Sequence, residues 1–223
     1  RSLEFFWRHF FQTNNHNNGH DQSLVCHMSP LDLYSFKYAC GPDIKTCLEF
    51  DFRQIQSESS ESTAVPIDEA NIEAKAQKIL KQYNKLGSLF PHNVALVLLG
   101  DDFRYNYDVE WKQQYENYNL LMNYVNNNGD KFDQAHISFG TLQDFFDAVQ
   151  ERLPFEAGNY PSLYGDFMPY ADMYVSSVPA YWTGYATTRP FHKHCGRELQ
   201  HWLRTVEILY SLTRNYYRQA QSP

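Results

Sequence analysis

The chain has 223 residues, of which 43% are hydrophobic and 20% charged, with a formal net charge of −7 at pH 7. These values are ordinary for a globular protein of one or two domains. The acidic balance and the lack of a basic cluster argue against nucleic-acid binding. No apolar run approaches the ~20 residues that a membrane span requires.

The first quarter of the chain is expected to be largely irregular. Residues 1–11 predict a helix, because apolar residues recur there at helical spacing. Residues 12–23 are polar and Asn-rich and predict a loop. Residues 24–52 are expected to be irregular, and the Ser- and Glu-rich residues 54–63 to form a solvated loop.

A helix is predicted after Pro66, with Asp68 as its cap and Gly87 at its end. Its apolar face comprises Ile72, Ala76, Ile79, Leu80, Tyr83 and Leu86. The following residues 93–99, which are apolar from Val94 to Leu99, predict a strand that is buried on both faces, as in a parallel sheet.

The second half of the chain alternates helices with one more predicted strand. A helix carries the stripe Trp111, Tyr115, Tyr118, Met122 and Val125 and ends at the Asn-rich residues 126–129. A strand over residues 132–139 and a helix bearing Leu142, Phe145, Phe146 and Val149 follow. Residues 153–179 predict a loop-rich passage, and one long helix is expected from Pro190 onward. This alternation predicts an α/β fold with a parallel sheet.

Two adjacent carboxylates, Asp101 and Asp102, follow directly after the predicted strand over residues 93–99. The carboxyl ends of parallel strands are where α/β enzymes place catalytic groups. Neighbouring carboxyl groups also resist joint ionisation when partly desolvated, which suits one of them to act as a general acid. A solvated turn after a core strand is the alternative interpretation, and position alone does not decide between the two.

Several blocks of the sequence, in order, resemble the class II α-mannosidases of glycoside hydrolase family 38, particularly their Golgi branch. The first is Gly100-Asp101-Asp102-Phe103-Arg104-Tyr105. The others are Leu3-Glu4-Phe5-Phe6-Trp7-Arg8, Cys26-His27-Met28-Ser29-Pro30, Cys40-Gly41-Pro42-Asp43, Phe50-Asp51-Phe52, Phe139-Gly140-Thr141-Leu142, Gly165-Asp166-Phe167-Met168-Pro169-Tyr170-Ala171-Asp172, Tyr181-Trp182-Thr183-Gly184-Tyr185 and Thr188-Arg189-Pro190-Phe191.

The resemblance implies a fragment of a longer enzyme. Three family motifs have no match here: the zinc-binding His-x-His-x-Asp-Pro-Gly-Trp, the nucleophilic Asp that also binds zinc, and His-His-Asp-Gly. Residues 1–180 would then be an incomplete parallel-sheet glycoside hydrolase catalytic domain. Residues 181–223 would begin a helical domain with the first long helix of its bundle.

The resemblance also assigns roles to three residues. Asp102 matches the acid/base of a retaining glycosidase, which protonates the leaving oxygen and then activates water. Asp101 would bind a substrate hydroxyl or tune its neighbour. Tyr34 matches a tyrosine that reaches the bound mannose, with a packed loop tyrosine as the alternative. Zinc is the implied cofactor; its ligands are expected outside this chain, since the nine His residues have no partners at ligand spacing.

The chain departs from the Golgi pattern where those enzymes grip a GlcNAc branch of the substrate. Ser35 stands where the family has an acid, Tyr38 where it has a His, and Met173 where it has an Arg. Residues 57–62 are Ser-rich in place of an expected Cys-Pro-Trp segment. The resemblance therefore leaves the cleavage site intact and puts the Golgi anchor in doubt.

Of the four cysteines, Cys40 and Cys47 could close a short loop, and family members pair these positions. Cys26 and Cys195 are expected to be reduced and buried.

The function implied is hydrolysis of α-linked mannose from N-glycans in the lumen of the secretory pathway. A membrane anchor is expected only upstream of this segment in the longer protein. The Golgi is the expected compartment and the lysosome the alternative. Two other interpretations remain: a catalytically degenerate glycan-binding homologue, and a broad-specificity lysosomal-type α-mannosidase.

Overall fold

The computed structural model describes residues 3–9, 23–31, 34–56, 60–156, 158–167, 169–171 and 174–220. It divides into two compact units, residues 1–166 and residues 167–223. The first contains a small mixed sheet and several helices; the second contains a two-stranded hairpin and a long helix. Within the described residues, no helix is long and apolar enough to cross a membrane.

The sheet of the first unit has the strand order β2-β1-β3 and uses strands that are far apart in the sequence. Strand β1 (Glu4–Arg8) pairs antiparallel with β2 (Leu24–His27) and parallel with β3 (Ser162–Tyr164). The predicted helix over residues 1–11 is therefore wrong. Its apolar spacing fits a helix equally well, and pairing with two distant strands decides the conformation.

The helices follow the sequence prediction more closely. Helix α3 (Ile72–Gly87) has Asn71 as its N-cap, so the predicted cap Asp68 is wrong. The Asp68 carboxylate instead closes the preceding turn, where it accepts the backbone N–H of Ala70 and Asn71, each at 2.9 Å. Helix α4 (Asp108–Asn127) ends at the predicted Asn-rich segment. Helix α5 (Leu142–Arg152) starts with a capping box formed by Thr141 and Asp144.

Two predicted strands are absent from the described residues. Residues 94–99 are half-buried but irregular, and this segment meets Ser35 through one isolated parallel bridge at Gly100. Residues 132–139 are also irregular; in this segment Asn126 Nδ2 donates to the Ile137 carbonyl at 2.8 Å, and Asn126 Oδ1 accepts the Ile137 backbone N–H at 2.9 Å. An apolar run becomes a strand only when neighbouring strands satisfy its backbone. The expected parallel sheet is thus a small mixed one here.

Other short elements lie in segments that were expected to be irregular or loop-rich, or for which no element was predicted. Helices α1 (Phe36–Ala39) and α2 (Ile44–Leu48) flank Gly41, and a 3-10 turn, η1 (Gly129–Lys131), follows α4. The hairpin of the second unit comprises β4 (Tyr174–Val175) and β5 (Val178–Pro179), and a short helix, α6 (Gly184–Thr187), follows it.

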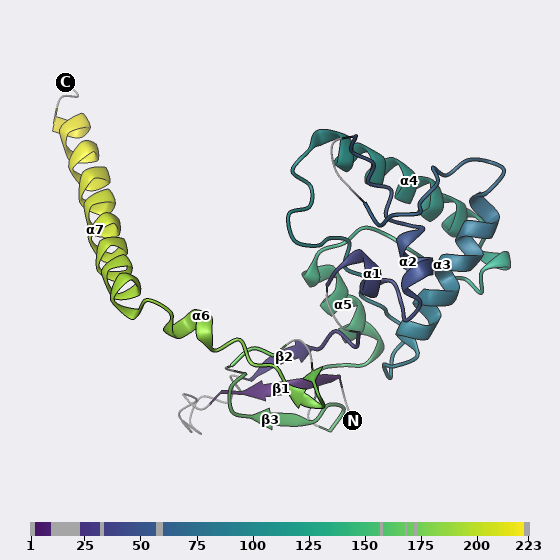
Figure 1. Ribbon diagram of the computed structural model, residues 1–223, viewed down its shortest axis with the longest axis horizontal. Coiled ribbons are helices and arrows are strands. Elements are labelled where there is room, and N and C mark those ends of the chain that lie inside the picture. The colour runs from purple at the N-terminus through teal and green to yellow at the C-terminus, as the bar shows by residue number, and fades with distance from the viewer. Residues whose placement is uncertain are drawn as a thin grey trace. The chain divides into compact units, whose positions relative to one another are not determined.

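The main core lies where α3 packs beside α4 and α2 (Figure 1). Its buried residues are Cys40, Cys47, Phe50, Phe52, Ala64, Ile67, Ala76, Ile79, Tyr118, Leu121, Met122, Val125 and Phe132. The disulfide between Cys40 and Cys47, with Cα atoms 5.6 Å apart, is the pair that the resemblance implies. Of the free cysteines, Cys26 is half-buried and Cys195 exposed, so the predicted burial is wrong for Cys195.

A second buried cluster joins the small sheet to α5. The Glu4 carboxylate, 2% exposed, binds His92 Nε2 at 2.8 Å and His27 Nδ1 at 3.0 Å. The His27 ring stacks on Phe90 and contacts the edge of Phe145. Burial raises the pKa of Glu4, but the bonds to the two imidazoles outweigh this and hold it below 4.5.

In the second unit the predicted long helix is present as α7 (Pro190–Ala220). Its expected apolar stripe, which includes Leu199, Trp202 and Leu209, is exposed within that unit.

Candidate active site

The three residues predicted to carry chemistry lie together in the first unit. The Tyr34 hydroxyl donates a hydrogen bond to Asp102 Oδ1. Asp101 Oδ1 accepts the backbone N–H of Asp102 at 2.7 Å. The bridge between Ser35 and Gly100 aligns the two segments just beside these interactions. Residues that are 68 positions apart thus form one polar group.

The backbone around this group adopts an unusual conformation. Phe103 and Tyr105, neither of them glycine, have φ values of 55° and 63°. Such left-handed residues cost about 1–2 kcal/mol each. The Phe103 side chain is 88% exposed, so packing of that ring does not hold the turn. Other interactions must offset the cost.

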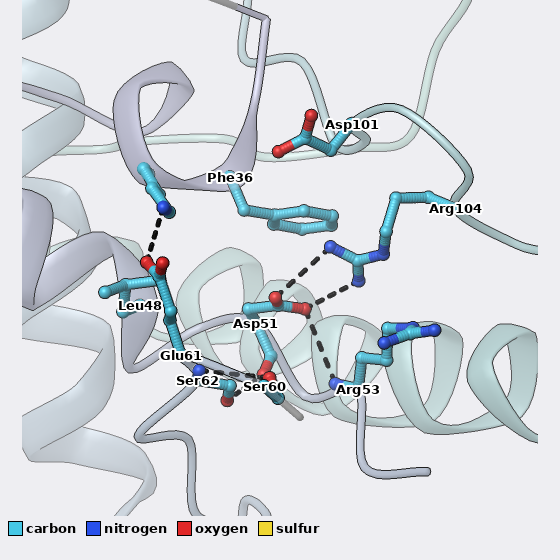
Figure 2. Close-up of a pocket in the computed structure, with 10 residues that line it drawn as sticks. Phe36, Leu48, Asp51, Arg53, Ser60, Glu61, Ser62, Asp101 and Arg104 are labelled. Carbon is cyan, nitrogen blue, oxygen red and sulfur yellow. Dashed lines mark hydrogen bonds and ion pairs between the residues drawn. The ribbon is translucent and has the colours of Figure 1, made fainter. Parts of the chain in front are cut away.

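Buried ion pairs provide that restraint, and Arg104 is their centre. Its guanidinium binds Asp51 through two nitrogens, at 2.7 and 3.2 Å, and Glu110 through Nε at 2.5 Å. Figure 2 shows the guanidinium lying between the Asp51 carboxylate and the Phe36 ring, whose centroid is 4.3 Å from Cζ. Arg104 therefore contacts residues from three separate segments.

Glu110 completes the network from the first turn of α4. Its side chain is fully buried and accepts Arg53 Nε at 3.1 Å and the backbone N–H of Tyr105 at 2.8 Å. Asp51 also accepts Gln114 Nε2 at 2.6 Å. Two acids thus face two arginines, and the charges balance inside the protein.

The electrostatics of the network favour charged arginine. Burial lowers the pKa of Arg104, but hydrogen bonds and charge attraction from Asp51 and Glu110 outweigh it, so the net shift is upward. Burial also raises the pKa of Tyr105 to about 12, and its hydroxyl donates to the Leu99 carbonyl at 3.0 Å.

Sequence reasoning missed these supporting residues. Arg104 and Asp51 stand inside quoted family blocks, so their position was a usable signal. Glu110 carries no comparable signal. Acidic residues are common in the first turn of a helix, because they interact favourably with the helix dipole, so Glu110 does not stand out in the sequence.

A polar pocket of about 170 Å³ lies beside this network. Its lining residues, drawn in Figure 2, are Phe36, Lys37, Leu48, Asp51, Arg53, Ser60, Glu61, Ser62, Asp101 and Arg104. Asp101 therefore faces a space that can hold several water molecules or a polar ligand group. Asp102 is not part of that lining, so the pocket and the predicted acid are adjacent rather than coincident.

The residues that differ from the Golgi pattern are only partly described. Tyr38 is half-buried, and Ser60 and Ser62 line the polar pocket. Met173 and residues 57–59 lie outside the described residues.

The described residues do not fit a metal site. No group of three or more His, Cys, Asp or Glu side chains is placed among them to hold an ion.

Comparisons with known proteins agree with the resemblance. The chain is 46% identical over 97% of its length to "Alpha-mannosidase 2" of Spodoptera frugiperda, covering 18% of that protein. It is 40% identical over 94% of its length to the Homo sapiens protein of the same name, again covering 18%. With "Alpha-mannosidase 2x" of Mus musculus, identity is 40% over 98% of the chain and 19% of the relative.

The chain thus spans about a fifth of the length of these relatives. Residues 1–173 match the model of the glycosyl hydrolases family 38 N-terminal domain. Since that match covers most of the sequence, the chain belongs to glycosyl hydrolase family 38.

Proposed function

We propose that this chain is part of a longer retaining α-mannosidase and supplies its general acid/base, Asp102. The hydrogen bond from Tyr34 to Asp102, on a turn held by buried ion pairs, is the observation that carries the proposal. Family membership and relatives named α-mannosidase support it.

The chemistry follows from the chain's own groups. In a retaining glycosidase two carboxyl groups act about 5 Å apart, one as nucleophile and the other as acid and then base. Asp102 would protonate the leaving glycosidic oxygen and then take a proton from the attacking water. The Tyr34 hydroxyl orients one Asp102 oxygen through the hydrogen bond that it donates. Asp101 would bind a substrate hydroxyl from the pocket side.

The nucleophile and the ligands of the expected zinc cofactor would lie in other parts of the longer protein. Its substrate would be a mannose-containing N-glycan in the lumen of the secretory pathway. The Golgi is the proposed compartment and the lysosome the alternative. Residues 181–223 would begin the helical domain; this boundary stays a prediction.

The test is Asp102→Asn in the longer protein. We expect kcat on a glycan substrate to fall by roughly 10² or more, because a general acid contributes about that much. Hydrolysis of an aryl mannoside with a good leaving group should fall much less. Asp101→Asn should mainly raise KM, and the exposed Asp130→Asn should leave both parameters unchanged. A wild-type rate for Asp102→Asn on the glycan would refute the assignment.

A catalytically degenerate glycan-binding homologue is the second candidate. The altered residues 35–39 favour it, because they replace most of a block that contacts substrate in the family. If this second candidate is right, the longer wild-type protein should bind glycans without hydrolysing them. Its sequence should also lack the His-x-His-x-Asp-Pro-Gly-Trp motif.

A further inference from the structure

Arg104 connects the two segments that meet at the Tyr34–Asp102 hydrogen bond. It lies two residues after Asp102 on the same turn. Its guanidinium also lies against the Phe36 ring, and Phe36 lies two residues after Tyr34. Two buried acids, Glu110 and Asp51, hold this same guanidinium.

These interactions hold the Arg104 guanidinium at its nitrogens and on one face. Asp51 holds its outer nitrogens, Glu110 holds Nε, and Phe36 covers one face. Glu110 then binds the backbone N–H of the next residue, Tyr105, at 2.8 Å. The indole Nε1 of Trp111 donates to the Tyr105 carbonyl at 3.0 Å, which pins the far end of the turn.

We propose that Arg104 is a positioning residue, which holds Asp102 and Tyr34 in the geometry needed for proton transfer. This inference rests on the proposed acid/base role of Asp102. Arg104 does not touch the reacting bond; it acts through the turn on one side and through Phe36 on the other.

Lysine cannot take this place. A guanidinium is planar and offers donors in a fixed fork, so it can bind two acids and lie flat on a ring at once. An ammonium is a compact charge on a flexible chain and would keep only part of these interactions. Arg104→Lys therefore preserves charge while it releases the turn.

The experiment uses the longer protein and a series of dinitrophenyl, nitrophenyl and phenyl α-mannosides. For these substrates kcat/KM reports the first, bond-breaking step, and the need for a proton rises along the series. We expect Arg104→Lys to lower kcat/KM about 10- to 100-fold for the phenyl mannoside, since small misplacements of a reacting group have effects of this size. For the dinitrophenyl mannoside the loss should be less than about threefold, because that leaving group needs no proton.

Two further variants separate positioning from general loosening. Phe36→Leu keeps both ion pairs and removes the stacked ring, so it should steepen the leaving-group dependence in the same direction by a smaller factor. This variant also keeps the test informative if Arg104→Lys does not fold. Arg53→Lys disturbs the Oε2 atom of the same Glu110 carboxylate, while the bond from Arg104 to Oε1 and the contact between Arg104 and Phe36 remain. It should change stability and leave the leaving-group dependence as in the wild type.

Each outcome has a distinct meaning. A steeper dependence in Arg104→Lys and Phe36→Leu, with none in Arg53→Lys, supports the inference. Equal losses across the series, or equal steepening in all three variants, overturn it while the proposed function stands. A wild-type protein that hydrolyses none of the mannosides overturns the proposed function itself, and the inference falls with it.

Discussion

Glu110 offers the sharpest test of what holds the carboxylate turn in place. Replacing it with Gln keeps the volume and removes the charge. The Glu110 oxygens accept three bonds, from Arg104, Arg53 and the Tyr105 backbone N–H. A glutamine has one acceptor oxygen, so its NH₂ group must face one of these donors.

The expected magnitude follows from these hydrogen bonds. If the glutamine oxygen stays on the Tyr105 side, the bond to Arg104 is broken, and a bond to a charged group contributes about 1.5–3 kcal/mol. The bond from Tyr105 becomes a neutral one and weakens by about 1 kcal/mol. Opening of the turn should therefore become easier by about 2.5–4 kcal/mol, which is about two to three decades in an equilibrium constant.

Native-state hydrogen exchange on the longer protein measures this directly. A peptide that contains the Tyr105 amide should exchange about two to three decades faster in Glu110→Gln than in the wild type. The matched control is Glu73→Gln, an exposed acid bound to Tyr124 and Lys131 at 2.7 and 3.0 Å, which should leave that peptide unchanged. If exchange in Glu110→Gln rises less than threefold, the buried ion pairs do not hold the turn.

Three further predictions concern specificity, acid stability and a tight turn. With Tyr38 in place of a His, the longer enzyme should prefer GlcNAc-bearing over GlcNAc-free glycans by much less than a typical Golgi member, and the ratio of kcat/KM values measures this. Removing a hydrogen bond to that sugar branch costs about 1–3 kcal/mol of discrimination, or one to two decades. Because the pKa of Glu4 is held below 4.5, its stabilising effect is present above that pH and is lost as pH falls through the lowered value. Glu4→Gln should therefore be less stable near neutral pH and lose less stability on acidification, which unfolding midpoints measured across pH will report. Gly41 has φ +151° and a Cβ there would lie 2.8 Å from Gln82 Cβ, so Gly41→Ala should lower the thermal midpoint.

Each of these three predictions has an outcome that would contradict it. A strong GlcNAc dependence would mean that other residues have rebuilt the anchor. Equal acid sensitivity of Glu4→Gln and the wild type would remove Glu4 from the acid transition. For the turn, Gly87→Ala is the control, because its added Cβ would lie at ordinary van der Waals distance from Ala95, and an equal effect of both substitutions would contradict the steric argument.

The amino-acid sequence alone was sufficient for the longer helices α3, α4, α5 and α7. Helices α3, α4 and α5 form where apolar residues recur at helical spacing, and α5 also has a capping box. Local spacing suffices because helix hydrogen bonds join residues four apart and need no distant partner. The family blocks named Asp101, Asp102 and Tyr34 as separate candidates, and their roles stay predictions; that Tyr34 contacts Asp102 is seen only in the structure.

Only the tertiary structure decided the sheet and the support of the site. Residues 4–8 form a strand because segments about 20 and 156 positions away pair with them. Residues 93–99 have only a single bridge beside them, at Gly100, and form no strand. The ion pairs of Arg104 with Asp51 and of Arg53 with Glu110 join residues 53 and 57 positions apart. Local spacing carries no information about such pairings, since they depend on how the chain returns to itself.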